Sequence, residues 1–166
     1  MIFRKQLLSN DCYRTVLGCL TDTEPQDVPH FMEEIGNEET ISVEVVERIN
    51  KWLQERGLDM ITTAYPVGED PFELQTLLDY IQETQGRDII YLLAGKSVTD
   101  NHVVICRGNK IIWDPSPVNS WIRGPAKNAY FIHYITNGTM RYNGPIPENQ
   151  TPFELGADDN EDQISV

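Results

Sequence analysis

The chain has 166 residues and a formal net charge of −13. A chain of this length suits one domain with one hydrophobic core, since about two thirds of the unfolded surface is buried at this size. The negative charge repels phosphate backbones and anionic lipid surfaces, so we expect neither a nucleic-acid nor a membrane partner. A neutral or basic peptide partner fits this charge, which plain solubility explains equally well.

The first residues and the cysteines indicate the compartment. No apolar run approaches the roughly 18 residues that span a bilayer, and the first six residues lack the apolar stretch of a signal peptide. The three cysteines, Cys12, Cys19 and Cys106, form no Cys-x-x-Cys pair and are too scattered for a disulfide framework. We therefore expect a cytoplasmic protein with free thiols, without a metal or a cofactor.

The first part of the chain has the apolar spacing and the capping residues of helices. Asn10 or Asp11 can cap the first helix, and Ser42 can cap the longest one. The predicted helices cover Cys12 to about Leu20, residues 25–31, and residues 43 to about 56.

From residue 60 onward, strands alternate with one more helix. Asp70-Pro71 is typical of the start of that helix, and Gly86 is typical of its end. Asn137-Gly138 is a turn signal that can fold residues 139–142 back as a last strand. The other predicted strands cover residues 60–65, 88–93, 102–107, 110–113 and 129–135. The pattern predicts an α+β domain in which N-terminal helices pack on an antiparallel sheet.

The end of the chain differs in composition. It is rich in Pro, Asn, Gln and acids, and no basic residue follows Arg141. Such segments bury too little apolar surface to order themselves. We expect one domain over residues 1–145 and an acidic, mobile tail over residues 146–166.

Cys12 stands where the first predicted helix begins. The helix dipole there favours a thiolate, and free backbone amides can stabilise an oxyanion. Asp11 opposes thiolate formation, so a cationic histidine would have to supply most of the activation. Gln6, six residues earlier, can add a side-chain donor to the oxyanion. A packed small side chain is the ordinary alternative for Cys12, and a solvated loop residue is the alternative for Gln6.

His102 and Asp114 supply the two remaining roles of a thiol hydrolase. His102 opens an apolar strand and can act as general base and acid, while Asp114 can fix its tautomer and stabilise its charged form. A hydrogen-bonded histidine at a sheet edge and an Asp-Pro turn are the ordinary explanations of these residues. The four roles are filled in a consistent order, which favours the functional interpretation.

The register of the hairpin decides whether these two side chains meet. If residues 107–109 form a three-residue loop, His102 lies directly opposite Asp114 on one side of the hairpin, and Ile112 and Trp113 point to opposite faces. A two-residue loop at Gly108-Asn109 shifts the register by one and sends His102 and Asp114 to opposite faces. Joint function of the two residues therefore predicts the three-residue loop.

These residues resemble the papain-like cysteine peptidase superfamily, and most closely the double-glycine leader peptidases that process bacteriocins. The shared features are Gln6, Asp11-Cys12, His102-Val103-Val104 and Asp114-Pro115, in that order. The match covers about the first 20 residues and residues 95 to 120. The resemblance implies a papain-like fold with Cys12 as nucleophile, His102 as general base and acid, Asp114 as orienting group and Gln6 as oxyanion donor.

Two departures limit this resemblance. Tyr13-Arg14 follow the cysteine where the leader peptidases have small residues, and these two side chains can crowd the substrate groove. Asn119-Ser120-Trp121 is similar to the Asn-Ser-Trp of papain, which leaves Asn119 as an alternative to Asp114 as the orienting residue.

The sequence thus predicts a thiol-dependent hydrolase that cleaves a peptide, isopeptide or related amide bond of a peptide or protein substrate through a thioester. Deamidation and acyl transfer to amines use the same triad and stay open as alternatives. So does a non-catalytic binding or inhibitor protein that keeps the fold. The sequence does not indicate an oligomeric state.

Overall fold

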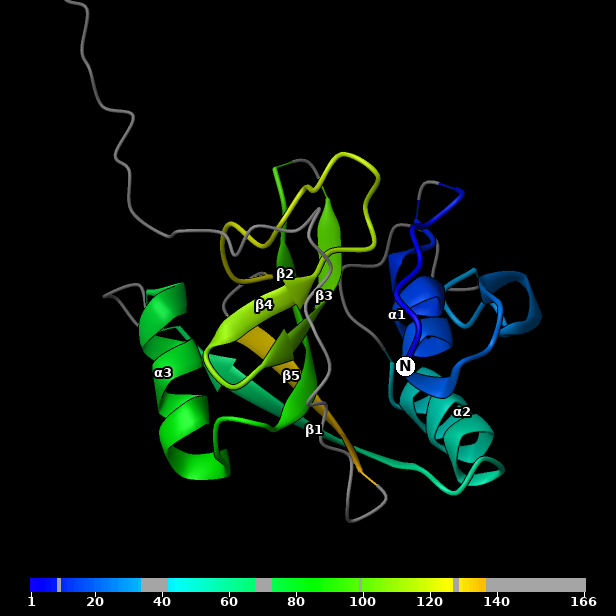
Figure 1. Ribbon diagram of the computed structural model, residues 1–166, viewed down its shortest axis with the longest axis horizontal. Coiled ribbons are helices and arrows are strands. Elements are labelled where there is room, and N and C mark those ends of the chain that lie inside the picture. Colours follow the sequence, from blue (N-terminus) through cyan, green and yellow to red (C-terminus); the bar gives the residue numbers. More distant parts are fainter. Residues whose placement is uncertain (9, 34–41, 68–72, 99, 127–128, 137–166) are drawn as a thin grey trace, which may run out of the picture.

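A five-stranded antiparallel sheet lies between two helical layers (Figure 1). The computed structural model describes residues 1–8, 10–33, 42–67, 73–98, 100–126 and 129–136. Its elements are α1 (Cys12–Thr21), the 3-10 helix η1 (Pro25–Asp27), α2 (Val43–Gln54), β1 (Asp59–Pro66), α3 (Leu74–Gln85), β2 (Ile90–Lys96), β3 (Asn101–Arg107), β4 (Lys110–Trp113) and β5 (Ala129–Thr136). The predicted α+β class is confirmed.

The strands lie in the order β1-β5-β2-β3-β4, so β5, the last in the sequence, is inserted between β1 and β2. Its position explains its burial, because β1 pairs with it along its whole length and β2 pairs with it over residues 91–94. β3 lies between β2 and β4, and α1 packs directly against β3. This contact brings the start of the chain to the strand that carries His102.

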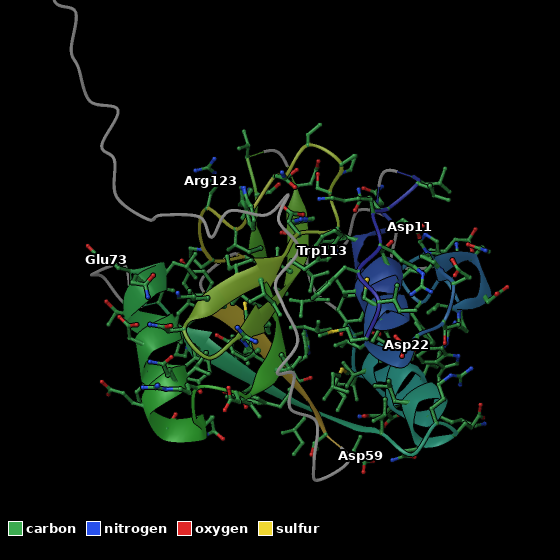
Figure 2. All side chains as sticks on the ribbon, in the orientation of Figure 1. Asp11, Asp22, Asp59, Glu73, Trp113 and Arg123 are labelled. Atoms are coloured by element: carbon green, nitrogen blue, oxygen red, sulfur yellow. The ribbon has the colours of Figure 1, made fainter. Side chains whose placement is uncertain are left out.

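Each face of the sheet carries its own hydrophobic core. Successive residues of a strand point to opposite faces, so β3 contributes Val103 and Ile105 to one core and Val104 and Cys106 to the other. The first core lies against α1 and α2, and the second lies against α3. Figure 2 shows side chains filling the space on both sides, with Trp113 on the side of α1. A strand covered on both faces has a continuous apolar run, as β3 has over residues 103–106.

The predicted helix boundaries have physical counterparts in the structure. Ser42 Oγ accepts a hydrogen bond of 3.4 Å from the amide of Val45 and so caps α2. Gly86, with a φ of 97°, follows the last residue of α3. Both predicted helices are therefore confirmed, each within about two residues of the expected ends where those ends are described.

The predicted three-residue hairpin loop is wrong. Arg107 pairs with Lys110, so the loop has the two residues Gly108 and Asn109. Gly108 has a φ of 54°, and an added Cβ would lie 2.6 Å from the carbonyl oxygen of Arg87. A tight turn with a positive φ at its first position suits glycine, and this makes the shorter loop possible here.

A register shift in β4 compensates for the shorter loop. Cys106 pairs with Ile111, but Ile105 pairs with Trp113, so Ile112 is an extra residue in β4. Ile112 and Trp113 both lie in the core on the side of α1. The register predicted from the sequence would have placed them on opposite faces of the sheet. Such a bulge changes the direction of every side chain that follows it. As a result, the two-residue loop does not separate Asp114 from His102.

Several predictions fall outside the described residues. These are the helix start at Asp70-Pro71, the turn at Asn137-Gly138 with its strand over 139–142, and the acidic tail over 146–166. Within the described ranges, no helix has both the length and the apolar character needed to cross a bilayer.

Candidate active site

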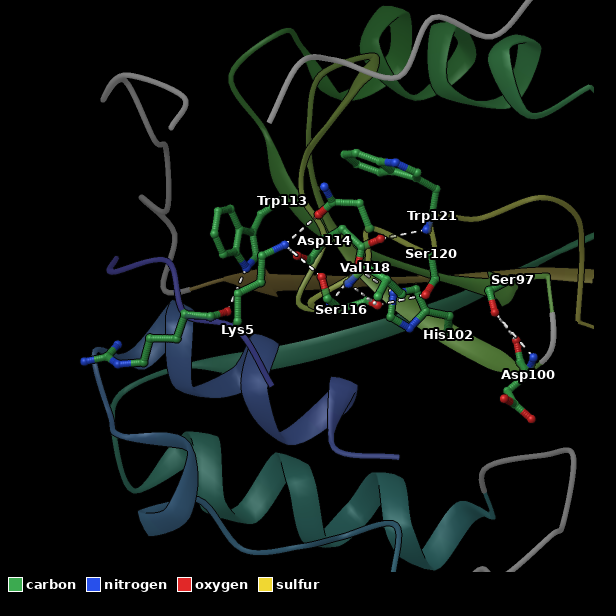
Figure 3. Close-up of polar contacts among 12 residues, drawn as sticks. Lys5, Ser97, Asp100, His102, Trp113, Asp114, Ser116, Val118, Ser120 and Trp121 are labelled. Atoms are coloured by element: carbon green, nitrogen blue, oxygen red, sulfur yellow. Dashed lines mark hydrogen bonds and ion pairs between the residues drawn. The ribbon is translucent and has the colours of Figure 1, made fainter. Parts of the chain in front are cut away.

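The His102 imidazole and the Asp114 carboxylate are in direct contact. His102 Nε2 lies 2.7 Å from Asp114 Oδ1, and the two side chains are 7% and 0% exposed. Asp114 follows the last residue of β4, so the loop after the strand holds it in place. Its Oδ1 also accepts from the amide of Ser116 at 2.7 Å, and its Oδ2 accepts from the amide of Trp121 at 2.6 Å (Figure 3).

Both sequence-based explanations of Asp114 therefore apply together. The bond from the Ser116 amide closes the turn that an Asp-Pro pair typically begins. The same carboxylate also binds the histidine. Because it is fully buried and accepts hydrogen bonds from two backbone amides as well as contacting His102, its position is fixed by the loop itself.

Cys12 is the first residue of α1 and is half-buried. Its thiol lies near enough to the His102 ring to contribute to the raised pKa of that imidazole. Since Nε2 of the ring binds Asp114, Nδ1 is the nitrogen left for the thiol. The sequence predicted this group of three residues, and the structure brings them together.

The environment of His102 favours its charged form. Burial lowers the pKa of the imidazole, but hydrogen bonds to Asp114 and Cys12 and the negative charges of those groups outweigh burial and raise the pKa to about 9. A ring with this pKa can hold the proton of a neighbouring thiol at neutral pH. The arrangement thus places a ring that favours its charged form beside a thiol, which is the pair of groups that thiol chemistry uses.

The start of α1 is not capped as predicted. Asp11 occupies the N-cap position without a side-chain cap, and Asn10 has a φ of 68°. The Asp11 carboxylate is buried instead, with Oδ1 3.7 Å from Arg14 Nη1 and 3.5 Å from His30 Nε2. The backbone amides of the first turn are thus not occupied by a capping side chain and can point to an anion. Arg14 also offsets part of the charge that was expected to oppose a thiolate.

Tyr13 and Arg14 have roles inside the fold. Tyr13 is 3% exposed, contacts the His133 ring edge-on and reaches Met60 Sδ with its hydroxyl at 3.5 Å. Arg14 donates to the carbonyl of Val28 at 2.7 Å and to that of Gln26 at 2.6 Å. These contacts tie Tyr13 to the sheet and Arg14 to the segment after α1, whereas the sequence had left open that both side chains crowd a substrate groove.

Gln6 lies beside the loop that carries Asp114. Its backbone amide donates to the carbonyl of Pro115 at 2.8 Å. Its side chain is half-buried, and Oε1 is buried without a hydrogen-bond partner among the described residues. Buried amide oxygens normally accept a hydrogen bond, so Oε1 is open to a donor.

Asn119, the alternative to Asp114, is bound to Lys5. Its Oδ1 accepts a hydrogen bond from Lys5 Nζ at 2.7 Å, and His102 is bonded to Asp114 instead (Figure 3). Lys5 itself was missed by the sequence analysis. Its partners are 109, 111 and 114 residues away in the sequence, and no local pattern links residues so far apart.

The other cysteines are structural by position. Cys19 and Cys106 are both fully buried, and burial raises the pKa of the Cys19 thiol to about 11 despite the opposing hydrogen bond with Arg4. Burial also raises the pKa of the Cys106 thiol. Neither thiol is suited to ionise at neutral pH. In the described part of the chain, no group of three or more His, Cys, Asp or Glu side chains could hold a metal ion.

Comparison with known proteins finds no match. No family model, no curated protein and no solved structure is similar to this chain at a significant level. The resemblance to papain-like peptidases therefore rests on the residues and on their arrangement.

Proposed function

We propose that this protein is a thiol-dependent hydrolase of the papain-like type, acting on a peptide, isopeptide or related amide bond. The observation that supports this most is the His102 ring, which is bonded to Asp114 at 2.7 Å and has its pKa raised by Asp114 and by the neighbouring Cys12. A nucleophile, a base and a group that orients the base are the parts that acyl transfer requires.

The proposed reaction begins with the thiolate of Cys12. Its sulfur attacks the substrate carbonyl, and the oxyanion that forms is stabilised by the Cys12 backbone amide and the Gln6 side-chain amide. His102 donates its proton to the departing amine as the carbon–nitrogen bond breaks, which leaves a thioester. Water then attacks the thioester carbonyl while His102 takes one of its protons. The carbon–sulfur bond breaks, the acid is released, and His102 can return that proton to the departing Cys12 sulfur.

The architecture agrees with this proposal. The nucleophile stands at the start of a helix that packs on an antiparallel sheet, and the histidine comes from that sheet. Within the superfamily, the order Gln6, Asp11-Cys12, His102 and Asp114-Pro115 favours the leader-peptidase branch. The net charge of −13 favours a neutral or basic peptide or protein substrate. Free thiols are typical of the reducing cytoplasm, where we place the protein.

Alkylation by iodoacetamide tests the activation of Cys12. We expect Cys12 to react at neutral pH on the order of 10-fold or more faster than an ordinary thiol, because the proposal gives it His102 as an adjacent base. His102→Gln should remove most of this excess, whereas His133→Gln, on the far side of Tyr13, serves as the matched histidine control. Equal rates in the wild type and in His102→Gln would contradict the proposal and would favour a non-catalytic binding protein.

A second experiment separates the reactions that share a triad. Incubation of a peptide mixture with the wild type and with Cys12→Ser, followed by mass spectrometry, should give chain cleavage that depends on Cys12. Conversion of glutamine side chains to glutamate would indicate a deamidase, and transfer to an added amine would indicate an acyltransferase. Trapping an activity-based probe on Cys12 in a lysate of the native host would identify the thioester chemistry directly.

A further inference from the structure

The Lys5 ammonium group is bound on three sides by one distant loop. Nζ donates to the carbonyl of Asp114 at 2.7 Å, to the carbonyl of Ser116 at 2.8 Å and to Asn119 Oδ1 at 2.7 Å (Figure 3). Its three donors are thus all used. Nζ also lies 4.6 Å from the centre of the Trp113 ring. A charged donor with three acceptors makes a strong and geometrically defined contact.

Lys5 belongs to a short segment that is attached to this loop at several points. We call residues 4–6 the N-terminal arm and residues 114–121 the site loop. Trp113 Nε1 donates to the carbonyl of Arg4 at 2.9 Å, and the amide of Gln6 donates to the carbonyl of Pro115 at 2.8 Å. Lys5 lies between these two backbone contacts. In these hydrogen bonds between the described residues of the arm and of the site loop, its ammonium is the charged donor.

The hydrogen bond from Lys5 to Asp114 goes to the backbone carbonyl, and the carboxylate acts on the ammonium group as a nearby charge. The carboxylate is held separately, by His102 and by the amides of Ser116 and Trp121. Removing the ammonium group therefore leaves the support of the carboxylate in place. It removes three of the five described hydrogen bonds between the arm and residues 113–119.

We propose that Lys5 is a positioning residue that holds the N-terminal arm on the site loop and thereby fixes the Gln6 side chain as an oxyanion donor. This inference rests on the proposed function, in which Gln6 has that role. Oxyanion donors act through fixed placement, so a donor on a loosened arm loses most of its effect. Lys5 acts through Gln6 and does not take part in forming the thiolate.

Amide hydrogen exchange tests the physical part of the proposal without any catalysis. Lys5→Met keeps the apolar stem over Trp113 but removes the three donors. The Gln6 amide, bonded to Pro115, should exchange on the order of 10-fold faster in this variant, because local opening becomes easier. The Thr15 amide, bonded to Asp11 inside α1, should keep its rate. Arg4→Met is the matched control on the same arm, since its guanidinium pairs with Glu24, away from the site loop.

A double-mutant cycle tests the catalytic part. Acetylation of Cys12 by p-nitrophenyl acetate passes through an oxyanion, whereas alkylation by iodoacetamide does not. Lys5→Met should slow acetylation on the order of 10-fold and leave alkylation within about 2-fold, and Lys5→Arg should restore part of the loss. In a Gln6→Ala background, Lys5→Met should have almost no further effect, because the two residues act as one unit.

The outcomes are distinct. An unchanged rate of hydrogen exchange at the Gln6 amide in Lys5→Met would overturn the proposal. So would a loss of acetylation rate from Lys5→Met that is equally large in the wild type and in Gln6→Ala. A loss of alkylation as large as that of acetylation would show that Lys5 acts through Asp114 instead, which also overturns it. If the wild type shows no acetylation that depends on His102, the proposed function fails, and the exchange rates still decide whether Lys5 holds the arm.

Discussion

At the scale of single residues, His102 is the group on which two opposing effects meet. Its ring is 7% exposed, and burial alone would keep it neutral. Contact with Asp114 on one side and Cys12 on the other reverses that preference. His133 shows the contrasting case, since burial lowers the pKa of its ring to about 4 although it lies in the same sheet.

The raised pKa of His102 predicts a particular dependence of stability on pH. The folded-state pKa of about 9 exceeds the ordinary value of 6.5, so the stabilisation is fully present below pH 6.5 and is lost as the pH rises through 9. Between pH 6.5 and 9, the free energy of unfolding of the wild type should fall relative to that of His102→Gln. The difference between the two proteins should shrink by up to about 3 kcal/mol. Urea unfolding at a series of pH values measures it. The lowered pKa of His133 affects stability only at lower pH and does not interfere with this measurement. A difference between wild type and His102→Gln that stays constant with pH would contradict the raised pKa of His102.

Asp114 and Asn119 can be compared as orienting residues by substitution. Asp114→Ala leaves His102 and two backbone amides without their partner in a buried site, and we expect a loss of about 3 kcal/mol in stability and slower alkylation of Cys12. Asn119→Ala removes an acceptor of Lys5 and should leave the alkylation rate within about 2-fold. Chemical unfolding and alkylation kinetics check both. A larger kinetic effect at Asn119 would reverse the assignment.

At the scale of elements, the bulge in β4 shows where sequence reasoning stops. The apolar residues 110–113 predicted a strand with the observed ends, Lys110–Trp113. Hydrophobic patterning cannot show that Ile112 and Trp113 share one face, because both faces of this sheet are buried and an alternating pattern is absent. The meeting of His102 and Asp114 was predicted correctly, but for a register that the protein does not adopt.

After the site loop, the backbone of Gly124 lies close to that of Gly95 in β2. The amide of Lys96 donates to the carbonyl of Gly124 at 2.8 Å, and a Cβ at Gly95 would lie 2.6 Å from that same oxygen. We expect Gly95→Ala to destabilise the protein by about 1–3 kcal/mol, because the backbone of residue 124 must move. Gly124→Ala is the matched control, since its Cβ would have no neighbour within 4 Å. Thermal unfolding of both variants checks this, and equal Tm values would contradict it.

At the scale of the whole molecule, the two cores have different relations to the site. The core on the α1 side contains Leu17, Trp113 and the partly buried Cys12, whereas the core under α3 contains Leu77 and lies on the opposite face of the sheet. Stability is thus contributed by both faces, whereas Cys12 packs only on the core on the α1 side. Figure 1 shows α3 on the other side of the sheet from α1.

Cavity-forming substitutions in the two cores should therefore differ in their effects. Leu17→Ala and Leu77→Ala each remove a fully buried side chain, and each should cost about 2–5 kcal/mol of stability. Only Leu17→Ala, in the helix that begins with Cys12, should also slow alkylation of that thiol per folded molecule. Urea unfolding combined with alkylation under native conditions makes the comparison. Equal slowing by Leu77→Ala would show that the site is coupled across the sheet.

The fold class, the helices and most strands could be predicted because they follow from apolar spacing and from local signals such as Ser42 and Gly86. The three residues Cys12, His102 and Asp114 could be predicted because their chemical roles are complementary. The sequence could not predict the role of Lys5, the contacts of Asp11 or the order of the strands. Each of these depends on partners that are distant in the chain or on a choice between two equally buried faces.

The contact between the N-terminal arm and the site loop also has a consequence for the order of folding. The arm is synthesised first, but its acceptors follow more than 100 residues later. Contacts of such separation form late, because the intervening chain must first be ordered. During synthesis, Cys12 therefore has neither His102 nor Asp114 beside it until β3, β4 and the site loop have folded against α1. Under the proposed function, the topology would delay a reactive thiol until the domain has folded.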